Sequence, residues 1–234
     1  LLPTAIPRLE RLEVAAGYTA ASDTLDVGGD FYEVLSGSFG GAAIIGDVCG
    51  RGAEAAALTA TARYTLIPII EQNPDSPARA LRELNRVICE HHEPTTRFVT
   101  VAVVMLRRHG DDVRARVALA GHPHPVVARS DGTVDRVGIA GSLIGIDPAI
   151  DVVDAEVRLG PGDALVLFTD GYTEARDEDG RMLGEAGLDA ALAAAASQGV
   201  DEMIAAADRA VAAHLGGRGS NDDRAILALR VAAA

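Results

Sequence analysis

Short apolar segments separated by turn residues dominate the chain up to about residue 170. The stretches 98–106 and 164–169 are almost continuously apolar, which is typical of strands buried on both faces, whereas 152–159 alternates as a half-buried strand does. Asp131-Gly132 is a hairpin signal between two strand patterns. The pattern therefore predicts strands over the following ranges: 12–19, 26–35, 41–48, 98–106, 113–120, 125–129, 133–137, 152–159, 164–169 and 224–231.

Helical patterns occur in two pairs. The first pair is 53–71, which we expect Pro68 to interrupt, and a helix that starts at Pro77 with Ser76 as its N-cap. The second pair is 185–196 and 201–214, both rich in alanine. Because strands come in consecutive groups and helices in consecutive pairs, we expect an α+β fold, a four-layer α/β/β/α sandwich of two antiparallel sheets flanked by helix pairs.

The length of 234 residues suits one domain with a sizeable core. We find no internal repeat, linker or low-complexity tract, so we expect residues 1–9 to be a lead-in segment and 10–234 a single domain. The chain begins with Leu rather than Met, which suggests a domain that belongs to a longer multidomain protein.

Charge and composition narrow the functional classes. The formal net charge of −13 argues against a nucleic acid or an anionic membrane surface as partner, because both require a basic face. All 21 basic residues are arginine, which we attribute to coding bias. No apolar run approaches the roughly 18 residues that span a bilayer, so we expect no membrane insertion. Two cysteines fit a reducing compartment, and we expect the cytoplasm.

Carboxylates stand where several of the predicted strands enter or leave the core. Asp47 follows the apolar run 41–45, in a glycine-rich elbow before the first helix, and Asp30 and Asp170 lie in comparable places. The pair Asp222-Asp223 precedes the last strand. Carboxylates gathered at a core edge raise one another's pKa, and divalent cations relieve that repulsion. Oxygen ligands select hard ions, so we expect Mn²⁺ or Mg²⁺.

An ordered set of motifs carries a family resemblance from about residue 10 to 231. The motifs are Gly28-Gly29-Asp30-Phe31-Tyr32, Gly46-Asp47-Val48-Cys49-Gly50, Ala120-Gly121-His122-Pro123, Pro161-Gly162-Asp163, Phe168-Thr169-Asp170-Gly171-Tyr172-Thr173-Glu174 and Asp222-Asp223. Together they resemble the SpoIIE/RsbU branch of the metal-dependent protein phosphatases (PPM, protein phosphatase 2C-like).

The resemblance implies a centre of two divalent cations. Asp47 would bridge both ions, and Asp30 and the backbone carbonyl of Val48 would serve the first. Asp170 and Asp222 would hold the second ion. The expected catalytic residues and metal ligands are therefore Asp30, Asp47, Val48, Asp170, Asp222 and Asp223, the last as a ligand, an outer partner or a solvated residue.

The expected reaction is the hydrolysis of phosphoserine or phosphothreonine by a water that the two ions acidify. By resemblance, the substrate would be a phosphorylated anti-anti-sigma factor, and upstream sensor domains and a homodimer would accompany the domain. The alternative is a catalytically weak or inactive module that keeps the fold and binds a partner. A two-metal nuclease is disfavoured by the acidic charge.

Two departures from the family pattern lie beside the bridging aspartate. Cys49 stands where eukaryotic relatives carry the histidine thought to protonate the leaving group, so a general acid at that place is in doubt. Arg51 stands where many bacterial relatives carry histidine, and it would either contact the substrate phosphate or be a solvated residue at the helix start. We expect His122 and His124 to form part of a rigid proline turn rather than a metal pair.

Overall fold

The computed structural model describes residues 2–21, 28–91, 97–220 and 222–232. Within these residues the strands and helices follow one another in the order that the sequence pattern predicts. The elements are β1 (Leu12–Thr19), β2 (Phe31–Gly37), β3 (Gly40–Val48), α1 (Ala53–Gln72), α2 (Pro77–His91), β4 (Val99–His109), β5 (Asp112–Ala120), β6 (Val126–Ala128), β7 (Val134–Arg136), β8 (Ala155–Leu159), β9 (Ala164–Phe168), the 3₁₀ turn η1 (Asp170–Tyr172), α3 (Gly184–Ala195), α4 (Val200–Leu215) and β10 (Arg224–Val231).

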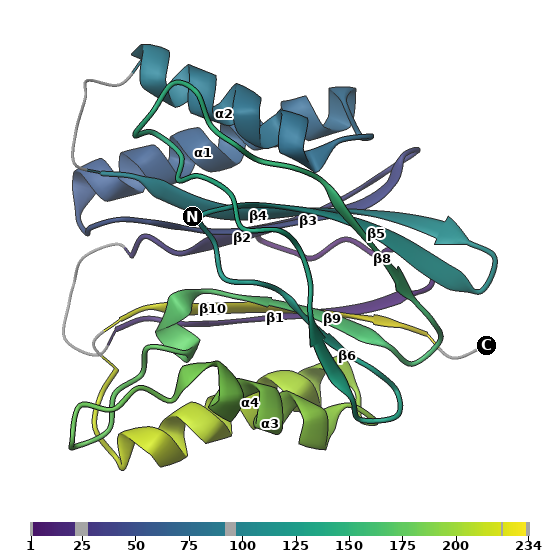
Figure 1. Cartoon of the computed structure of the whole chain (residues 1–234), viewed down its shortest axis with the longest axis vertical. Helices are drawn as coiled ribbons and strands as arrows, with labels where there is room; N and C mark the ends of the chain where they lie inside the picture. The colour runs from purple at the N-terminus through teal and green to yellow at the C-terminus, as the bar shows by residue number, and fades with distance from the viewer. Residues whose placement is uncertain (1, 22–27, 92–96, 221, 233–234) are drawn as a thin grey trace.

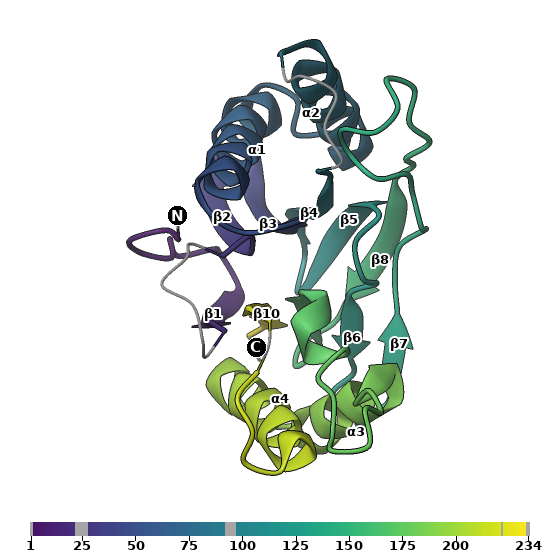
Figure 2. The ribbon, with the colours of Figure 1, turned by 90° about the vertical axis from the view of Figure 1, so that its left-hand side faces the viewer.

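Two five-stranded sheets stack face to face, with a helix pair on each outer side (Figures 1 and 2). One sheet has the order β2-β3-β4-β5-β8 and is covered by α1 and α2; the other has the order β1-β10-β9-β6-β7 and is covered by α3 and α4. The strand pairs are antiparallel throughout the described residues. The predicted four-layer α/β/β/α sandwich is therefore confirmed.

Three apolar clusters correspond to the three interfaces between the layers. Side chains of α1 and α2 such as Leu66 and Leu84 pack on the first sheet, and side chains of α3 and α4 such as Leu192 pack on the second. Between the sheets, alternate residues such as Ile45 and Leu227 form the middle cluster. Both sheets thus bury both faces, which is why the central strands are nearly continuous apolar runs.

The predicted interruption of the first helix was wrong, and two strands begin later than predicted. Pro68 does not interrupt α1, which continues to Gln72. Pro68 lies on the exposed face of the helix, while Leu66 and Ile70 are fully buried against the sheet on the other face. Packing of that apolar face therefore keeps the helix together despite the hydrogen bond that proline removes.

The second difference concerns the strand predicted over 26–35, which begins only at Phe31. Asp26 and Val27 lie outside the described residues, and Gly28, Gly29 and Asp30 form an irregular segment before the strand. Similarly, β8 starts at Ala155 rather than at 152.

The expected N-cap of α2 is present. The Ser76 hydroxyl accepts a hydrogen bond from the Arg79 amide at 3.2 Å and donates one to Asp154 at 2.7 Å. Asp154 also accepts from the Ala78 amide at 2.7 Å, so the residues before β8 cap this helix instead of extending the strand.

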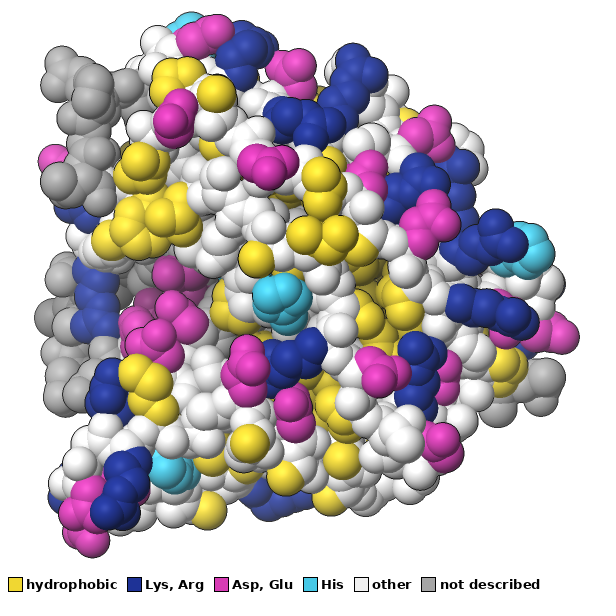
Figure 3. All heavy atoms as spheres, in the orientation of Figure 1, with side chains coloured by type: hydrophobic (Ala, Val, Ile, Leu, Met, Phe, Trp, Pro, Cys, Tyr) yellow, Lys and Arg dark blue, Asp and Glu magenta, His cyan; other side chains and the backbone are white. Residues whose placement is uncertain are grey.

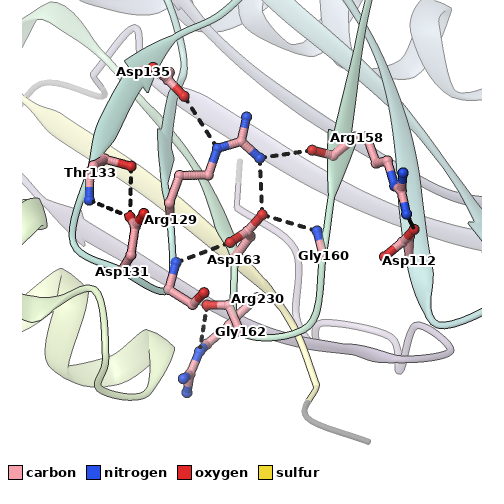
Figure 4. A network of polar contacts seen from close by, with 11 residues as sticks. Asp112, Arg129, Asp131, Thr133, Asp135, Arg158, Gly160, Gly162, Asp163 and Arg230 are labelled. Carbon is pink, nitrogen blue, oxygen red and sulfur yellow. Dashed lines mark hydrogen bonds and ion pairs between the residues drawn. The ribbon is translucent and has the colours of Figure 1, made fainter.

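The Pro161-Gly162-Asp163 motif forms a polar junction between the sheets (Figure 4). The Asp163 carboxylate accepts from the Ser130 and Gly160 amides, both at 3.0 Å, and pairs with Arg129 at 2.9 Å. Arg129 in turn donates to the carbonyl oxygen of Arg158 on β8 at 2.9 Å. This motif therefore joins β9 of one sheet to β8 of the other and has a structural role.

Candidate active site

Acidic residues from both sheets meet at one end of the sandwich. Asp47 lies near the end of β3 and Asp30 directly before β2, on the first sheet. Asp170 begins η1 after β9, and Asp222 and Asp223 precede β10, on the second. Figure 2 looks at this end of the molecule, and in Figure 3 acidic side chains gather there at the left edge, level with the space between the sheets.

Glycines make the close approach of these segments possible. A Cβ atom on Gly29 would lie 2.7 Å from Asp47 Oδ1 and would collide with the carbonyl oxygen of Val48. A Cβ atom on Gly28 would collide with the carboxylate of Asp223 and lie 2.6 Å from the hydroxyl of Tyr18. The Gly28-Gly29 pair thus fits between the acids of the two sheets because it has no side chains.

Burial and mutual repulsion dominate the electrostatics of the acidic cluster. Burial, followed by repulsion from Asp170 and Asp222, raises the pKa of Asp47 to about 7. Burial and repulsion from Asp47 raise the pKa of Asp30 well above its usual range, against the effect of a 2.6 Å hydrogen bond that Thr169 donates to it. Burial and the neighbouring Asp222 also raise the pKa of Asp170. Each negative charge therefore costs free energy in the folded chain.

A pocket of about 260 Å³ opens beside the acids. Its lining includes Asp47, Asp170, Asp222, Asp223 and the backbone of the glycine-rich elbow. Arg51, at the pocket mouth, pairs with the exposed carboxylate of Asp222 at 3.2 Å. The structure thus places Arg51 beside the acids, where a guanidinium can meet an anionic ligand.

The residues fit divalent cations in donor chemistry and in charge. The donors are carboxylates with the Val48 carbonyl close to them, an all-oxygen set of the kind that Mn²⁺ and Mg²⁺ prefer. The raised pKa values show that added positive charge would be favourable here. In the described part of the chain, no three His, Cys, Asp or Glu side chains form a ready-made coordination group, so the position of each ion stays a prediction.

Several residues at this site escaped the sequence reasoning. Tyr18 on β1 has its pKa raised to about 12 by burial and by repulsion from Asp223, Asp30, Asp222 and Asp47. Thr59 of α1 donates to the carbonyl oxygen of Gly29 at 3.3 Å, and Arg97 donates to that of Cys49 at the same distance. None of them belongs to a recognisable motif, so only long-range contacts reveal them.

Thr100 of β4 is a further unexpected residue, because it lines the pocket and its hydroxyl contacts His122 at 2.9 Å. His122 is buried in the segment between β5 and β6. Glu174 adds to the repulsion that raises the pKa of Asp170.

Solved structures with the same fold define the class of protein. The RsbU and RsbW domains of Rv1364c from Mycobacterium tuberculosis match with a TM-score of 0.79 at 24% identity, over 97% of this chain and 62% of that one. The SiaA-PP2C domain of Pseudomonas aeruginosa matches with a TM-score of 0.78 at 25% identity, over 92% and 85% of the two chains. The fold is thus that of the PP2C-like serine/threonine protein phosphatases.

Sequence comparison defines the family. The family model described as "Stage II sporulation protein E (SpoIIE)" matches residues 40–232. The phosphoserine phosphatase RsbU of Bacillus subtilis (strain 168) is 30% identical over 181 residues, which is 77% of this chain and 52% of RsbU. The chain belongs to the SpoIIE family, and it spans about half the length of RsbU. The predicted resemblance is therefore confirmed.

Proposed function

We propose that this chain is a metal-dependent phosphatase that removes phosphate from phosphoserine or phosphothreonine in a protein. The observation that carries the proposal is the convergence of five aspartates from both sheets, four of which line one pocket and three of which have a raised pKa. Asp47 and Asp30, with the Val48 carbonyl, would hold one divalent cation, and Asp170 and Asp222 the other. Such ions lower the pKa of bound water and neutralise charge on phosphoryl oxygens.

The chain's own residues would bind and orient the phosphoryl group. Arg51 can exchange its ion pair with Asp222 for phosphate oxygens, since that pair is exposed to solvent and therefore weak. The elbow of Cys49 and Gly50 is held by Arg97, whose guanidinium lies against Gly50, and so forms a fixed wall of the pocket. Cys49 offers no strong acid at the place of the family histidine, so the leaving oxygen would take its proton from solvent.

The substrate would be a phosphorylated anti-anti-sigma factor, in keeping with the similarity to RsbU and to a protein that joins RsbU and RsbW domains. By the same similarity, upstream sensor domains and a homodimer would accompany the domain; the chain covers about half of RsbU. A cytoplasmic location is consistent with the free thiols of Cys49 and Cys89. No helix among the described residues is long and apolar enough to cross a membrane.

Hydrolysis of para-nitrophenyl phosphate and of a serine-phosphorylated protein, with Mn²⁺, with Mg²⁺ and with EDTA, tests the proposal. We expect turnover only with a divalent cation. Asp47→Asn and Asp170→Asn, one from each sheet, should each lower kcat at least 100-fold without unfolding the protein, whereas the exposed Asp201→Asn of α4 should keep wild-type activity. Full activity of either site variant would refute the ligand assignment.

The second candidate is a non-catalytic module that uses the same pocket to bind a phosphorylated partner. The cysteine at position 49 is the observation that favours it. A wild-type protein that binds the phosphoprotein but turns over neither substrate with any cation would decide for this candidate.

A further inference from the structure

The Ala120-Gly121-His122-Pro123 motif has no part in the function proposed above. Its histidine is nevertheless buried and contacts Thr100, which lines the pocket. The His122 side chain is only 5% exposed. Its Nδ1 atom lies 2.9 Å from the hydroxyl oxygen of Thr100, and its Nε2 atom has no hydrogen-bond partner among the described residues. A buried polar side chain with one unsatisfied nitrogen is costly, so a histidine here needs a reason.

Thr100 connects this histidine to the candidate active site. It is the residue of β4 directly opposite Asp47 of β3 in the antiparallel ladder. Opposite residues of such a pair project from the same face of the sheet, and Thr100 also lines the pocket. In the described part of the chain, the Thr100 hydroxyl bonds to no side chain other than His122. The Thr100 hydroxyl can therefore make a second hydrogen bond to a group in the pocket.

The tautomer of the His122 ring decides whether the Thr100 hydroxyl donates a hydrogen bond to the pocket or accepts one from it. Burial lowers the pKa of His122 to about 3, so the imidazole is neutral at physiological pH and carries one proton. The backbone carbonyls of Phe168 and Thr100 oppose this pKa shift, which places both acceptors near the ring. The neutral tautomer protonated on Nε2 leaves Nδ1 as an acceptor toward Thr100. Nδ1 then accepts the Thr100 hydroxyl hydrogen, and the hydroxyl oxygen faces the pocket as an acceptor.

We propose that the Thr100 hydroxyl oxygen accepts a hydrogen bond from the water that attacks the phosphoryl group, and that His122 is the positioning residue that fixes this orientation. The inference rests on the proposed phosphatase function. In the step, the water oxygen forms a bond to phosphorus while the bond from phosphorus to the serine oxygen breaks and its electron pair leaves with that oxygen. One proton of the water stays on the phosphate and the other ends on the serine oxygen. Thr100 orients the water and takes no proton.

The first test is a mutant cycle read as kcat and KM for para-nitrophenyl phosphate with Mn²⁺. We expect Thr100→Val, which keeps the shape of the side chain, to lower kcat about 10- to 100-fold with KM within about twofold. Thr100→Ser should stay within about threefold of wild type. His122→Asn should lower kcat about tenfold, and the double variant should be no slower than Thr100→Val, because His122 acts through Thr100. The exposed His109→Asn on β4 is the matched control and should match wild type.

The second test needs no activity. Nitrogen NMR of the histidine rings should show His122 neutral and protonated on Nε2 down to about pH 5. A ring protonated on Nδ1, or one that titrates near pH 6.5, would overturn the inference, and so would an active wild type whose Thr100→Val variant keeps its kcat. A wild type without metal-dependent hydrolysis would instead overturn the proposed function itself.

Discussion

The negative charge of Asp47 destabilises the folded chain, and the proposed divalent cation would remove that destabilisation. Its carboxylate is surrounded by four other aspartates, and the guanidinium of Arg51 pairs with the exposed one among them, Asp222. At the scale of single residues the site is therefore strained by charge rather than by backbone geometry. That strain can be measured in the metal-free protein, independently of catalysis.

Asp47→Asn should stabilise the metal-free protein at pH 8. Burial and the neighbouring acids raise the pKa of Asp47 from 3.8 to about 7 in the folded state. The folded chain then binds more protons than the unfolded chain between these values, so stability falls as pH rises through that range. We expect urea unfolding in EDTA to show a gain of roughly 1–4 kcal/mol at pH 8 that disappears below pH 4. If wild type and Asp47→Asn were equally stable at pH 8, the result would contradict charge repulsion at Asp47.

Gly29→Ala should damage the site more than the fold. The added methyl group would meet the Val48 carbonyl and Asp47 Oδ1, which have to move apart to admit it. We expect kcat/KM for metal-dependent hydrolysis to fall at least tenfold, while the free energy of unfolding changes by about 1–3 kcal/mol. Gly199→Ala is the control, because a Cβ atom there meets nothing within 4 Å. Activity unchanged by Gly29→Ala would show that this close approach is dispensable.

At the scale of elements, the sequence motifs divide into those that form the site and those that hold the layers together. The acidic motifs lie at one end of the sandwich, whereas Pro161-Gly162-Asp163 lies at the junction of β8 and β9. Motif order alone could not separate these roles. The hydrogen bonds that the Asp163 carboxylate accepts from backbone amides identify it as structural.

Asp163→Ala should therefore destabilise the protein by about 2–4 kcal/mol, because it removes the more buried of the two carboxylates that pair with Arg129 and leaves two backbone amides without their acceptor. Activity per folded molecule should not change. Asp135→Ala removes the other carboxylate that pairs with Arg129, but this one is exposed, so we expect a loss below about 1 kcal/mol. Chemical unfolding and kcat of both variants provide the check, and a loss of kcat in folded Asp163→Ala would assign the motif to the site.

Periodicity was enough to predict the strands, the helix pairs and their layers, since apolar runs and alternation report burial directly. It failed where a contact from elsewhere in the chain decides the local structure. Phe31 starts β2 late because Gly28 and Gly29 are packed against Asp223 and Asp47. The acids of the candidate site could be named from motif order. Tyr18 and Thr100 could not, because strand pairing between distant segments brings them to the site.

At the scale of the whole molecule, the proposed cations would join the two sheets. Asp47 belongs to one sheet and Asp170 to the other, so an ion held by both would stabilise the folded state against separation of the layers. We expect Mn²⁺ at 100 times its dissociation constant to add about 2.7 kcal/mol of stability. Asp47→Asn and Asp170→Asn should each abolish most of the thermal shift that Mn²⁺ produces, and Asp201→Asn should retain it. A full shift in either site variant would show that the ion binds elsewhere.

The pairing of β1 with β10 has a consequence for synthesis on the ribosome. Among the described residues β1 pairs with β10, and Asp222 and Asp223 directly precede β10. A nascent chain that ends before β10 has an open sheet edge and an incomplete set of acids, whatever its earlier segments have formed. On the proposed function, the chain would therefore become able to catalyse hydrolysis only after β10 has been synthesised. Fragments released before that point would have no phosphatase activity.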